Sequence, residues 1–291
     1  MIDTLTSLAF SVYSGKGVYA LLLGSGISRA AEIPTGWEIT LDLIRKVAAI
    51  EKQDCGADPA QWYSKRFGKE PDYSALLEKM AVTQAERTNA LRAYFEATVE
   101  ERESGKKMPT LAHKAIARLV AKDYVRIIIT TNFDRLIEQA LEAEGISPTV
   151  ISSPDMAHGA IPLVHSRCTV IKVNGDYRDT RLKNTTAELS TYDPETDKLL
   201  DRVFDEYGLI ICGWSATWDV ALRSALLRSA SRRYSATWAT RGNLSPEANT
   251  LIAFRRASVL EIESADRFLS LLAEKVERSR DLAPLIHSPL R

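Results

Sequence analysis

With 291 residues, the chain is long enough for one large domain or two modest ones with a sizeable core. Lysine plus arginine equals aspartate plus glutamate at 38 each, so the net charge gives no reason to expect binding to nucleic acid or to an acidic membrane. The three cysteines stand singly, which excludes a structural zinc ribbon and is typical of a reducing compartment.

The sequence shows no secretory leader and no membrane span. Its N-terminus lacks a basic region, and no apolar run approaches the roughly 18 residues that a membrane helix needs. We therefore expect a cytoplasmic protein that does not contact a membrane. Cys168 and Cys212 lie in apolar, strand-like runs, where we expect buried thiols.

The first informative element is the unbroken apolar run at 18–23, which ends in the loop Gly24–Ser28. Such a run is typical of a strand buried on both faces of a parallel sheet. Two glycines two residues apart allow a tight turn and a close approach to a ligand, and free amides at a helix start bind anions. The loop therefore predicts a pyrophosphate site. A plain βα turn without a ligand is the alternative, because Arg29 replaces the third glycine of the common dinucleotide fingerprint.

Strands and helices alternate along the rest of the chain. Further strands are expected at 125–131, 149–152, 168–173, 209–212, 236–239 and 259–262. Helices are expected within 1–17 and at 37–50, 110–121, 135–144, 193–207, 218–228, 246–254 and 265–278. This alternation predicts an α/β fold, a Rossmann-like parallel sheet with helices on both faces.

One segment interrupts the alternation. From about 50 to 108 the sequence shows no convincing strand, and residues 72–104 follow a helical pattern. Residues 51–68 are polar and broken by Gly56, Pro59 and Gly68, which predicts an irregular stretch. We expect a single domain over 1–291 with a helical insertion, a small lid, at about 50–108.

Four of the expected strands end in small polar residues. These ends are Gly24–Ser28, Thr130–Asp134, Lys172–Asp176 and Gly213–Ser215. In open α/β sheets the ligand lies outside the carboxyl ends of the strands. The four ends therefore predict one shared crevice, which is a more specific signal than a single glycine loop.

The motifs, in this order, resemble those of the sirtuins, the silent information regulator proteins. The segment from Gly24 to Gly36 is similar to the family's Gly-Ala-Gly-x-Ser…Gly-Ile-Pro loop, and Thr131–Asp134 is similar to its Gln-Asn-Ile-Asp. Lys172–Asp176 matches the Lys-Leu-His-Gly block except at one position. Gly213–Ser215 with Asp219 resembles the Gly-Tyr-Ser…Asp segment of bacterial sirtuin-like defence proteins, and the resemblance covers roughly 18–279.

The resemblance implies NAD binding, and it favours one of two chemistries. Sirtuin deacylases carry a four-cysteine zinc ribbon, which this chain lacks, so a lysine deacylase is disfavoured and no zinc is expected. The bacterial defence branch has a helical insertion instead, and it hydrolyses NAD to nicotinamide and ADP-ribose in antiphage abortive infection. Membership of that branch further implies a homo-oligomer and an activating partner protein or fused sensor domain.

The same resemblance assigns roles to individual residues. Asn132 would orient the ribose and the attacking water, and Asp134 would support the loop or the ribose hydroxyls. The implied cofactor-binding residues are Gly24, Ser25, Gly26, Ile27 and Ser28 at the pyrophosphate, Pro34 and Trp37 in a flap over nicotinamide, and Gly213, Trp214 and Ser215 on the adenosine side.

One position departs from the family pattern, because Asn174 stands where the family has its catalytic histidine. A neutral amide cannot accept a proton from a ribose hydroxyl. Either the site is slow or switched off, or Asp176 or His165 serves as the base; a natural asparagine and an engineered one look the same in a sequence. An NAD hydrolase is therefore the leading function. The alternatives are a catalytically weak NAD- or ADP-ribose-binding regulatory subunit and a purely structural partner subunit.

Plain structural interpretations compete at several positions. Asn132 precedes a helix and is a good N-cap, and Asn174-Gly175 is a strong hairpin signal. Trp37, Trp214, Trp218 and Trp238 are more typical of a core than of cofactor stacking, and His113, His158, His165 and His287 are more typical of structural positions.

Overall fold

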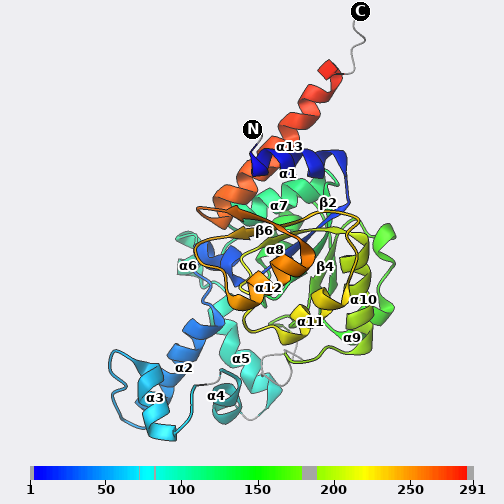
Figure 1. Cartoon of the computed structure of the whole chain (residues 1–291). Coiled ribbons are helices and arrows are strands. Elements are labelled where there is room, and N and C mark those ends of the chain that lie inside the picture. The colour runs from blue at the N-terminus through cyan, green and yellow to red at the C-terminus, as the bar shows by residue number, and fades with distance from the viewer. Residues whose placement is uncertain (1–2, 72, 82, 179–188, 287–291) are drawn as a thin grey trace, which may run out of the picture.

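The computed structural model describes residues 3–71, 73–81, 83–178 and 189–286, and a seven-stranded parallel sheet lies at its centre (Figure 1). The strand order is β3-β4-β2-β1-β5-β6-β7. The strands are β1 (Tyr19–Leu23), β2 (Val125–Thr130), β3 (Thr149–Ile151), β4 (Thr169–Lys172), β5 (Gly208–Cys212), β6 (Ala236–Thr240) and β7 (Ser258–Glu261). The predicted parallel α/β sheet is confirmed, strand for strand.

Strand β1 is the central strand because its apolar side chains are buried on both faces. Leu21 and Leu23 pack into one core, and Ala20 and Leu22 pack into the other, as the alternation of side chains along a strand requires. From β1 the chain builds β2, β4 and β3 on one side and then returns to place β5 on the other side. The switch point between β1 and β5 is where doubly wound sheets open a crevice.

Helices cover both faces of the sheet, as predicted (Figure 1). One core includes side chains from α1 (Thr4–Ser14), α7 (Leu111–Ala121), α8 (Leu136–Ala143) and α13 (Ala265–Ile286). The other includes side chains from α10 (Pro194–Glu206), α11 (Val220–Arg228) and α12 (Pro246–Arg255). A short helix α9 (Pro154–Gly159), which the sequence analysis did not predict, follows β3.

The insertion forms a helical lobe that projects from the sheet in Figure 1. The projecting part contains α2 (Gly36–Ile50), α3 (Pro59–Phe67), α4 (Tyr73–Met80) and α5 (Gln84–Phe95), so it begins with α2 and not at about residue 50. Helix α6 (Val99–Glu103) lies beside the main body in Figure 1. Leu43, Tyr63 and Leu77 belong to the core of the projecting part, which reaches the main body through Leu136 and Tyr177.

The prediction that residues 51–68 are irregular is wrong from residue 59 onwards. Asp58 caps helix α3 by accepting from the Gln61 amide at 2.9 Å, and Pro59 is tolerated because the first helical position needs no amide donor. Gly68, in the left-handed conformation, ends the helix. Here proline and glycine marked the ends of a helix and not its absence.

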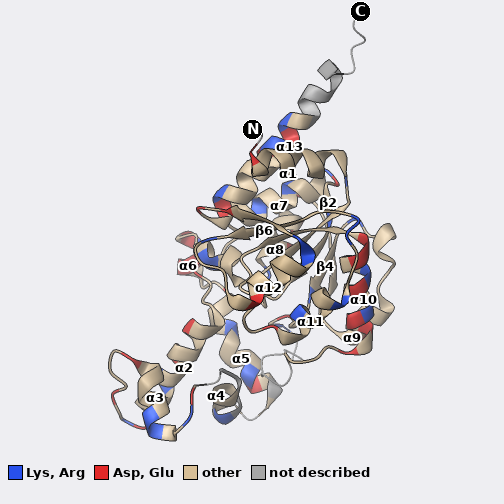
Figure 2. Cartoon of the chain, viewed as in Figure 1, with Lys and Arg blue, Asp and Glu red and all other residues tan. Residues whose placement is uncertain are grey.

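Charged residues of both signs are distributed over the elements in Figure 2. The acidic face of α10 is partly neutralised by Arg228, which contacts Asp197 at 2.6 Å and Asp201 at 2.9 Å. Within the described residues, no helix is long and apolar enough to cross a membrane, and no cluster of histidine, cysteine or carboxylate side chains could hold a metal ion.

The prediction of buried thiols is confirmed for both strand cysteines. Burial raises the pKa of Cys168 to about 12 and that of Cys212 to about 12. Both side chains therefore stay protonated and inert at neutral pH.

Candidate functional site

Two loops meet at the switch point and pack backbone against backbone. A Cβ atom on Gly24 would lie 2.4 Å from the carbonyl oxygen of Gly213, and one on Gly26 would lie 2.7 Å from the Cα of Gly213. Gly213 itself has φ +71, a conformation that favours glycine. The three glycines are therefore required by the contact between the loops, whether or not a ligand is bound.

The amides of this loop are less available than the glycine spacing suggested. The Gly24 amide donates to the carbonyl of Cys212 at 3.1 Å, and the Gly26 amide donates to the carbonyl of Gly213 at 2.9 Å. The expectation of free amides is wrong at these two positions, because the β5 loop supplies acceptors. The chain continues as a single 3₁₀ helix, η1 (Ser25–Ala31), with Ser25 exposed at its start.

A cleft of about 750 Å³ opens beside these loops. Its volume lies within the range usual for small-molecule sites. Five residues expected to bind the cofactor line it: Gly26, Ile27, Gly213, Trp214 and Ser215. The other lining residues come from η1, from β6 and the loop after it, and from the start of α13 with the residue before it; they include Arg29, Trp238, Thr240, Arg241, Asn243, Ser264 and Asp266. The predicted adenosine side therefore coincides with an open cleft.

The predicted flap residues follow η1 in the chain and do not line this cleft. Pro34 precedes α2, and Trp37 lies in the first turn of that helix with 47% of its surface exposed. Trp218 is 70% exposed, so the core interpretation is wrong for these two tryptophans. It is confirmed for Trp214 and Trp238, whose buried rings stack with centroids 5.6 Å apart.

Ser28 is the centre of a buried polar cluster that joins η1 to the end of β2. Its Oγ donates to Asp134 Oδ2 at 2.9 Å and accepts from Asn132 Nδ2 at 3.1 Å. His113 Nε2, from α7, lies 3.5 Å from the same oxygen. The expected catalytic residues Asn132 and Asp134 are thus brought together, on a serine that the resemblance placed at the pyrophosphate.

In this cluster, the hydrogen bonds determine which atom of each side chain donates and which atom accepts. The Thr110 amide donates to His113 Nδ1 at 3.2 Å, so the ring proton must lie on Nε2 and face Ser28. Burial lowers the pKa of His113, and the Asp134 carboxylate only partly opposes this, so the ring is neutral. Because Ser28 gives its one proton to Asp134, Asn132 must present its amide nitrogen to Ser28. The Asn132 carbonyl oxygen is then left buried and without a partner among the described residues.

The N-cap interpretation of Asn132 is wrong, because helix α8 begins later in the chain, at Leu136. Asp134 Oδ1 accepts from the Leu136 amide at 3.1 Å at the start of α8, and the N-cap position is Arg135.

Asn174 is held by a residue to which the sequence analysis gave no role. Its Nδ2 donates to Asp219 Oδ1 at 2.9 Å and lies 3.4 Å from the carbonyl of Thr131. The other oxygen of Asp219 accepts from Trp214 Nε1 at 2.7 Å. The Asn174 carbonyl oxygen is buried, again with no partner in the described part of the chain. Asn174-Gly175 makes a tight turn and not the predicted hairpin, because β4 is already paired in parallel on both sides, with β2 and β3.

A buried ionic network lies beneath the polar loops. Lys172 Nζ, which is completely buried, contacts Asp176 Oδ2 at 3.0 Å and Glu138 Oε1 at 3.2 Å. It also donates to the carbonyls of Phe133 at 3.2 Å and Asp134 at 2.5 Å, which fixes the loop after β2. Burial raises the pKa of Glu138, and Lys172 opposes this shift.

The two candidate bases are placed differently. Asp176 adjoins the polar loops, but its oxygens are engaged by Arg135 at 2.7 Å, by Lys172 and by the Arg178 amide at 3.0 Å. His165 lies in η2 (Leu163–His165), before β4, and the next residue contacts Thr149 at the start of β3. His165 is therefore near the amino edge of the sheet, away from the other predicted site residues.

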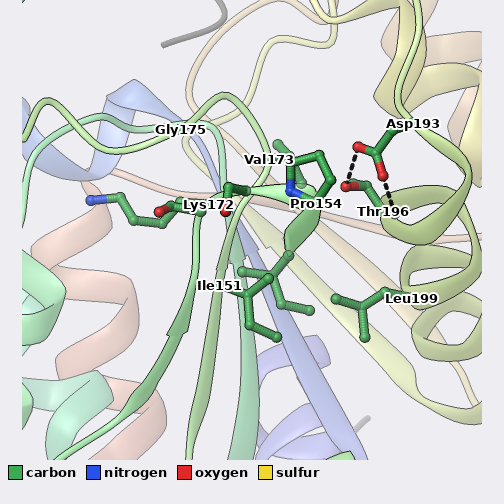
Figure 3. A pocket seen from close by; sticks show the side chains of 11 residues that line it. Ile151, Pro154, Lys172, Val173, Gly175, Asp193, Thr196 and Leu199 are labelled. Atoms are coloured by element: carbon green, nitrogen blue, oxygen red, sulfur yellow. Dashed lines mark hydrogen bonds between the residues drawn. The ribbon is translucent and has the colours of Figure 1, made fainter. Parts of the chain in front are cut away.

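A second cavity, of about 250 Å³, lies between the ends of β3 and β4 and helix α10 (Figure 3). Ile151, Val173 and Leu199 line it, and Thr196 Oγ1 donates to Asp193 Oδ2 at 2.7 Å at its rim. Figure 3 shows the ammonium group of Lys172 pointing away from it. None of the predicted catalytic or cofactor-binding residues lines this cavity, so it is not the predicted NAD site.

The sequence of the second half of the chain matches a known family. Residues 126–262, a little under half of the chain, match the family model described as the SIR2-like domain. This part of the chain is therefore similar in sequence to the SIR2-like domain. This SIR2-like segment runs from β2 to β7 and includes Asn132, Asn174 and Gly213. No curated protein matches the chain.

Solved structures of Sir2 proteins share the fold over nearly the whole chain. A structure described as the basis for the mechanism and regulation of Sir2 enzymes is 18% identical, covers 97% of this chain and 100% of its own, and has a TM-score of 0.50. A Sir2 homologue in complex with NAD is 17% identical over 96% and 95%, with a TM-score of 0.50. A histidine-to-asparagine variant of a Sir2 homologue with ADP-ribose is 16% identical over 97% and 99%, with a TM-score of 0.51. At these identities the likeness establishes the Sir2-like fold.

Sequence reasoning missed three residues of this site. His113 resembles the histidine of the family's Pro-x-x-x-His helix but was interpreted as structural, Lys172 was noted only as part of a motif, and Asp219 was quoted without a role. All three lie in or next to motifs that resemble the family's, and that was the available signal; Asp219, for example, follows the Gly-Trp-Ser motif at the end of a predicted strand.

Proposed function

We propose that the chain binds NAD along the carboxyl edge of its sheet and hydrolyses the bond between nicotinamide and ribose, releasing nicotinamide and ADP-ribose. One observation carries this proposal. The side-chain carbonyl oxygens of Asn132 and Asn174 are buried, and neither accepts a hydrogen bond from any residue that the structure describes. They follow the neighbouring strands β2 and β4. Buried acceptors without donors are costly, so their retention points to ligand or water hydroxyls as their partners.

The chemistry needs what these residues can offer. Nicotinamide leaves NAD as a neutral base, so its departure requires no proton donor. The protein must hold the ribose and place a water molecule against the cationic transition state. Amide oxygens can orient hydroxyl groups for this purpose without taking a proton. Asn132 and Asn174 would hold the ribose hydroxyls and the attacking water.

The adenosine half has a different kind of site. The cleft beside Gly26, Gly213 and Ser215 is lined by aromatic and small apolar residues together with several polar side chains. Mainly apolar walls with a few polar groups are typical of nucleotide sites. The NAD complex and the ADP-ribose complex described above are consistent with this reading, because both proteins share the fold.

The covered position of the two asparagine oxygens bears on regulation. A ligand would reach them only after the residues that bury them have moved. We include in the proposal that the enzyme acts in antiphage defence, that it forms a homo-oligomer, and that a partner protein or fused sensor domain triggers the opening. Support for these three points is the resemblance of the Gly213–Asp219 segment to bacterial defence proteins.

The test is direct. Purified protein is incubated with NAD, and nicotinamide and ADP-ribose are separated by chromatography. We expect Asn132→Ala to lower the rate about 100-fold, in line with the loss of a polar group that acts on the transition state. Asn249→Ala, an exposed asparagine on α12, is the matched control and should retain the rate. Absence of nicotinamide release by the wild type, alone and with candidate partners, would reject the proposal.

A second candidate function is favoured by Asn174 itself. With no base at this position, the site could hold NAD or ADP-ribose as a regulatory ligand without cleaving it. Calorimetric binding of NAD without turnover, together with a gain of turnover in Asn174→His, would favour this function over the hydrolase.

A further inference from the structure

Asp219 joins two loops through two different kinds of donor. Its Oδ1 accepts from Asn174 Nδ2 at 2.9 Å, and its Oδ2 accepts from Trp214 Nε1 at 2.7 Å. Asp219 is buried, and it begins helix α11 without capping it through its side chain. An aspartate at a helix start is ordinarily explained by capping, and here that explanation fails.

The loop that carries Asp219 is itself fixed. Arg223, one turn into α11, donates to the carbonyls of Ala216 and Thr217, each at 2.6 Å. Ala216 has φ +62, a left-handed conformation that is uncommon for alanine. The backbone is thus held in a constrained shape that delivers one carboxylate between Asn174 and Trp214.

We propose that Asp219 is a positioning residue that sets which end of the Asn174 amide is offered to the ligand. This inference rests on the proposed function of the site. A carboxylate only accepts hydrogen bonds, so Asn174 must turn its nitrogen towards Asp219. Its carbonyl oxygen is then left for the ligand, which makes Asn174 an acceptor for a ribose hydroxyl or water.

A single substitution should reverse this arrangement. In Asp219→Asn the indole N–H of Trp214 can still only donate, so the new amide must turn its oxygen to Trp214 and its nitrogen to Asn174. Asn174 must then rotate and offer its own oxygen to that nitrogen. The ligand would meet an N–H donor where it had met an acceptor.

A second substitution should undo the reversal. Trp214→Phe removes the indole donor and keeps an aromatic ring against Trp238. In that background the amide introduced by Asp219→Asn can turn its oxygen back to Asn174, which restores the native orientation of Asn174. The cost of Asp219→Asn should therefore depend on whether Trp214 is present, which a merely structural or purely electrostatic role of Asp219 would not produce.

The experiment compares wild type, Asp219→Asn, Trp214→Phe and the double variant by the kcat of nicotinamide release and by ADP-ribose affinity. We expect Asp219→Asn to lower kcat about 30-fold in the wild-type background and less than about threefold in the Trp214→Phe background, because a mispaired polar group costs more than a neutral exchange. Equal losses in both backgrounds, or no loss in either, would overturn the inference.

The same four proteins distinguish a defect in folding from a loss of activity. If only Asp219→Asn fails to fold while the double variant folds and acts at the Trp214→Phe rate, the inference is supported; if the double variant also fails to fold, it is rejected. If the wild type binds ADP-ribose without releasing nicotinamide, the affinities decide in place of kcat. If the wild type neither binds nor cleaves, the proposed function fails first, and that result differs from an active wild type whose variants show no coupling.

Discussion

The carboxyl edge of the sheet has two halves that are built in opposite ways. The glycine half, Gly24, Gly26 and Gly213, is formed by the absence of side chains, and its two loops touch through their backbones beside an open cleft. The polar half, Ser28, Asn132, Asn174 and Asp219, is formed by interlocked side chains and is covered. The glycine half depends on the close approach of two backbones, whereas the polar half depends on which atom donates and which accepts in each hydrogen bond.

The largest expected effect on the free energy of unfolding comes from the buried ionic network around Lys172, which lies beneath the polar half. Lys172→Met would leave Glu138 and Asp176 buried near one another without their ammonium partner. Loss of one partner in a buried ion pair typically costs about 3–5 kcal/mol, so we expect a fall of that size in the free energy of unfolding, measured in urea. Lys198→Met breaks an exposed pair with Glu195 and should cost less than about 1 kcal/mol. If both variants lowered the free energy of unfolding equally, the buried network would not stabilise the polar half.

A smaller effect is expected in the glycine half. Gly24→Ala would place a Cβ 2.4 Å from the Gly213 carbonyl oxygen, so the two loops must separate. Overpacking of this kind typically costs about 1–3 kcal/mol in the free energy of unfolding. Gly159→Ala, whose Cβ would meet no atom within 4 Å, is the control and should be close to neutral. A neutral Gly24→Ala would mean that the loops do not need their close contact.

The smallest expected effect is a dependence of the free energy of unfolding on pH, which we attribute to His113, the histidine next to Ser28. Burial lowers the pKa of His113, so below its usual value near 6.5 the unfolded chain binds a proton that the folded chain does not. The stability that neutral His113 contributes is therefore fully present above that value and is lost as the pH falls towards the lowered pKa of the folded state.

The loss should be about 1.4 kcal/mol per pH unit between the two pKa values. His113→Gln should flatten the dependence of stability on pH in this window, as measured by urea unfolding at several pH values. His158→Gln, at a side chain that is 82% exposed, should leave the slope unchanged. The same slope in both variants would contradict a neutral, buried His113.

The sequence was sufficient for the sheet and for the position of the glycine half, but not for the contacts of its amides. Apolar runs marked the inner strands β1, β2, β4 and β5, which are almost fully buried, and the glycine spacing marked the place of a tight loop. Fold class followed from the alternation of these runs with amphipathic helices.

The polar half could be predicted only in part, because its contacts join distant positions. Ser28 meets His113 across 85 residues, and Asn174 meets Asp219 across 45, and no local pattern encodes either pair. Local rules also misled at Asn132, since the N-cap position of α8 is Arg135 and the Leu136 amide donates to Asp134. The orientation of each side chain could be established only from the hydrogen bonds of the folded structure.

The central claim is that the two halves hold the two ends of one dinucleotide, and ligand fragments test it most directly. Calorimetry would compare AMP, which needs only the cleft beside the glycine half, with ADP-ribose, which also reaches the polar half. We predict that Asn132→Ala weakens ADP-ribose binding about fivefold or more, as expected for one hydrogen bond, and leaves AMP binding unchanged. Equal weakening of both ligands, or of neither, would contradict the account.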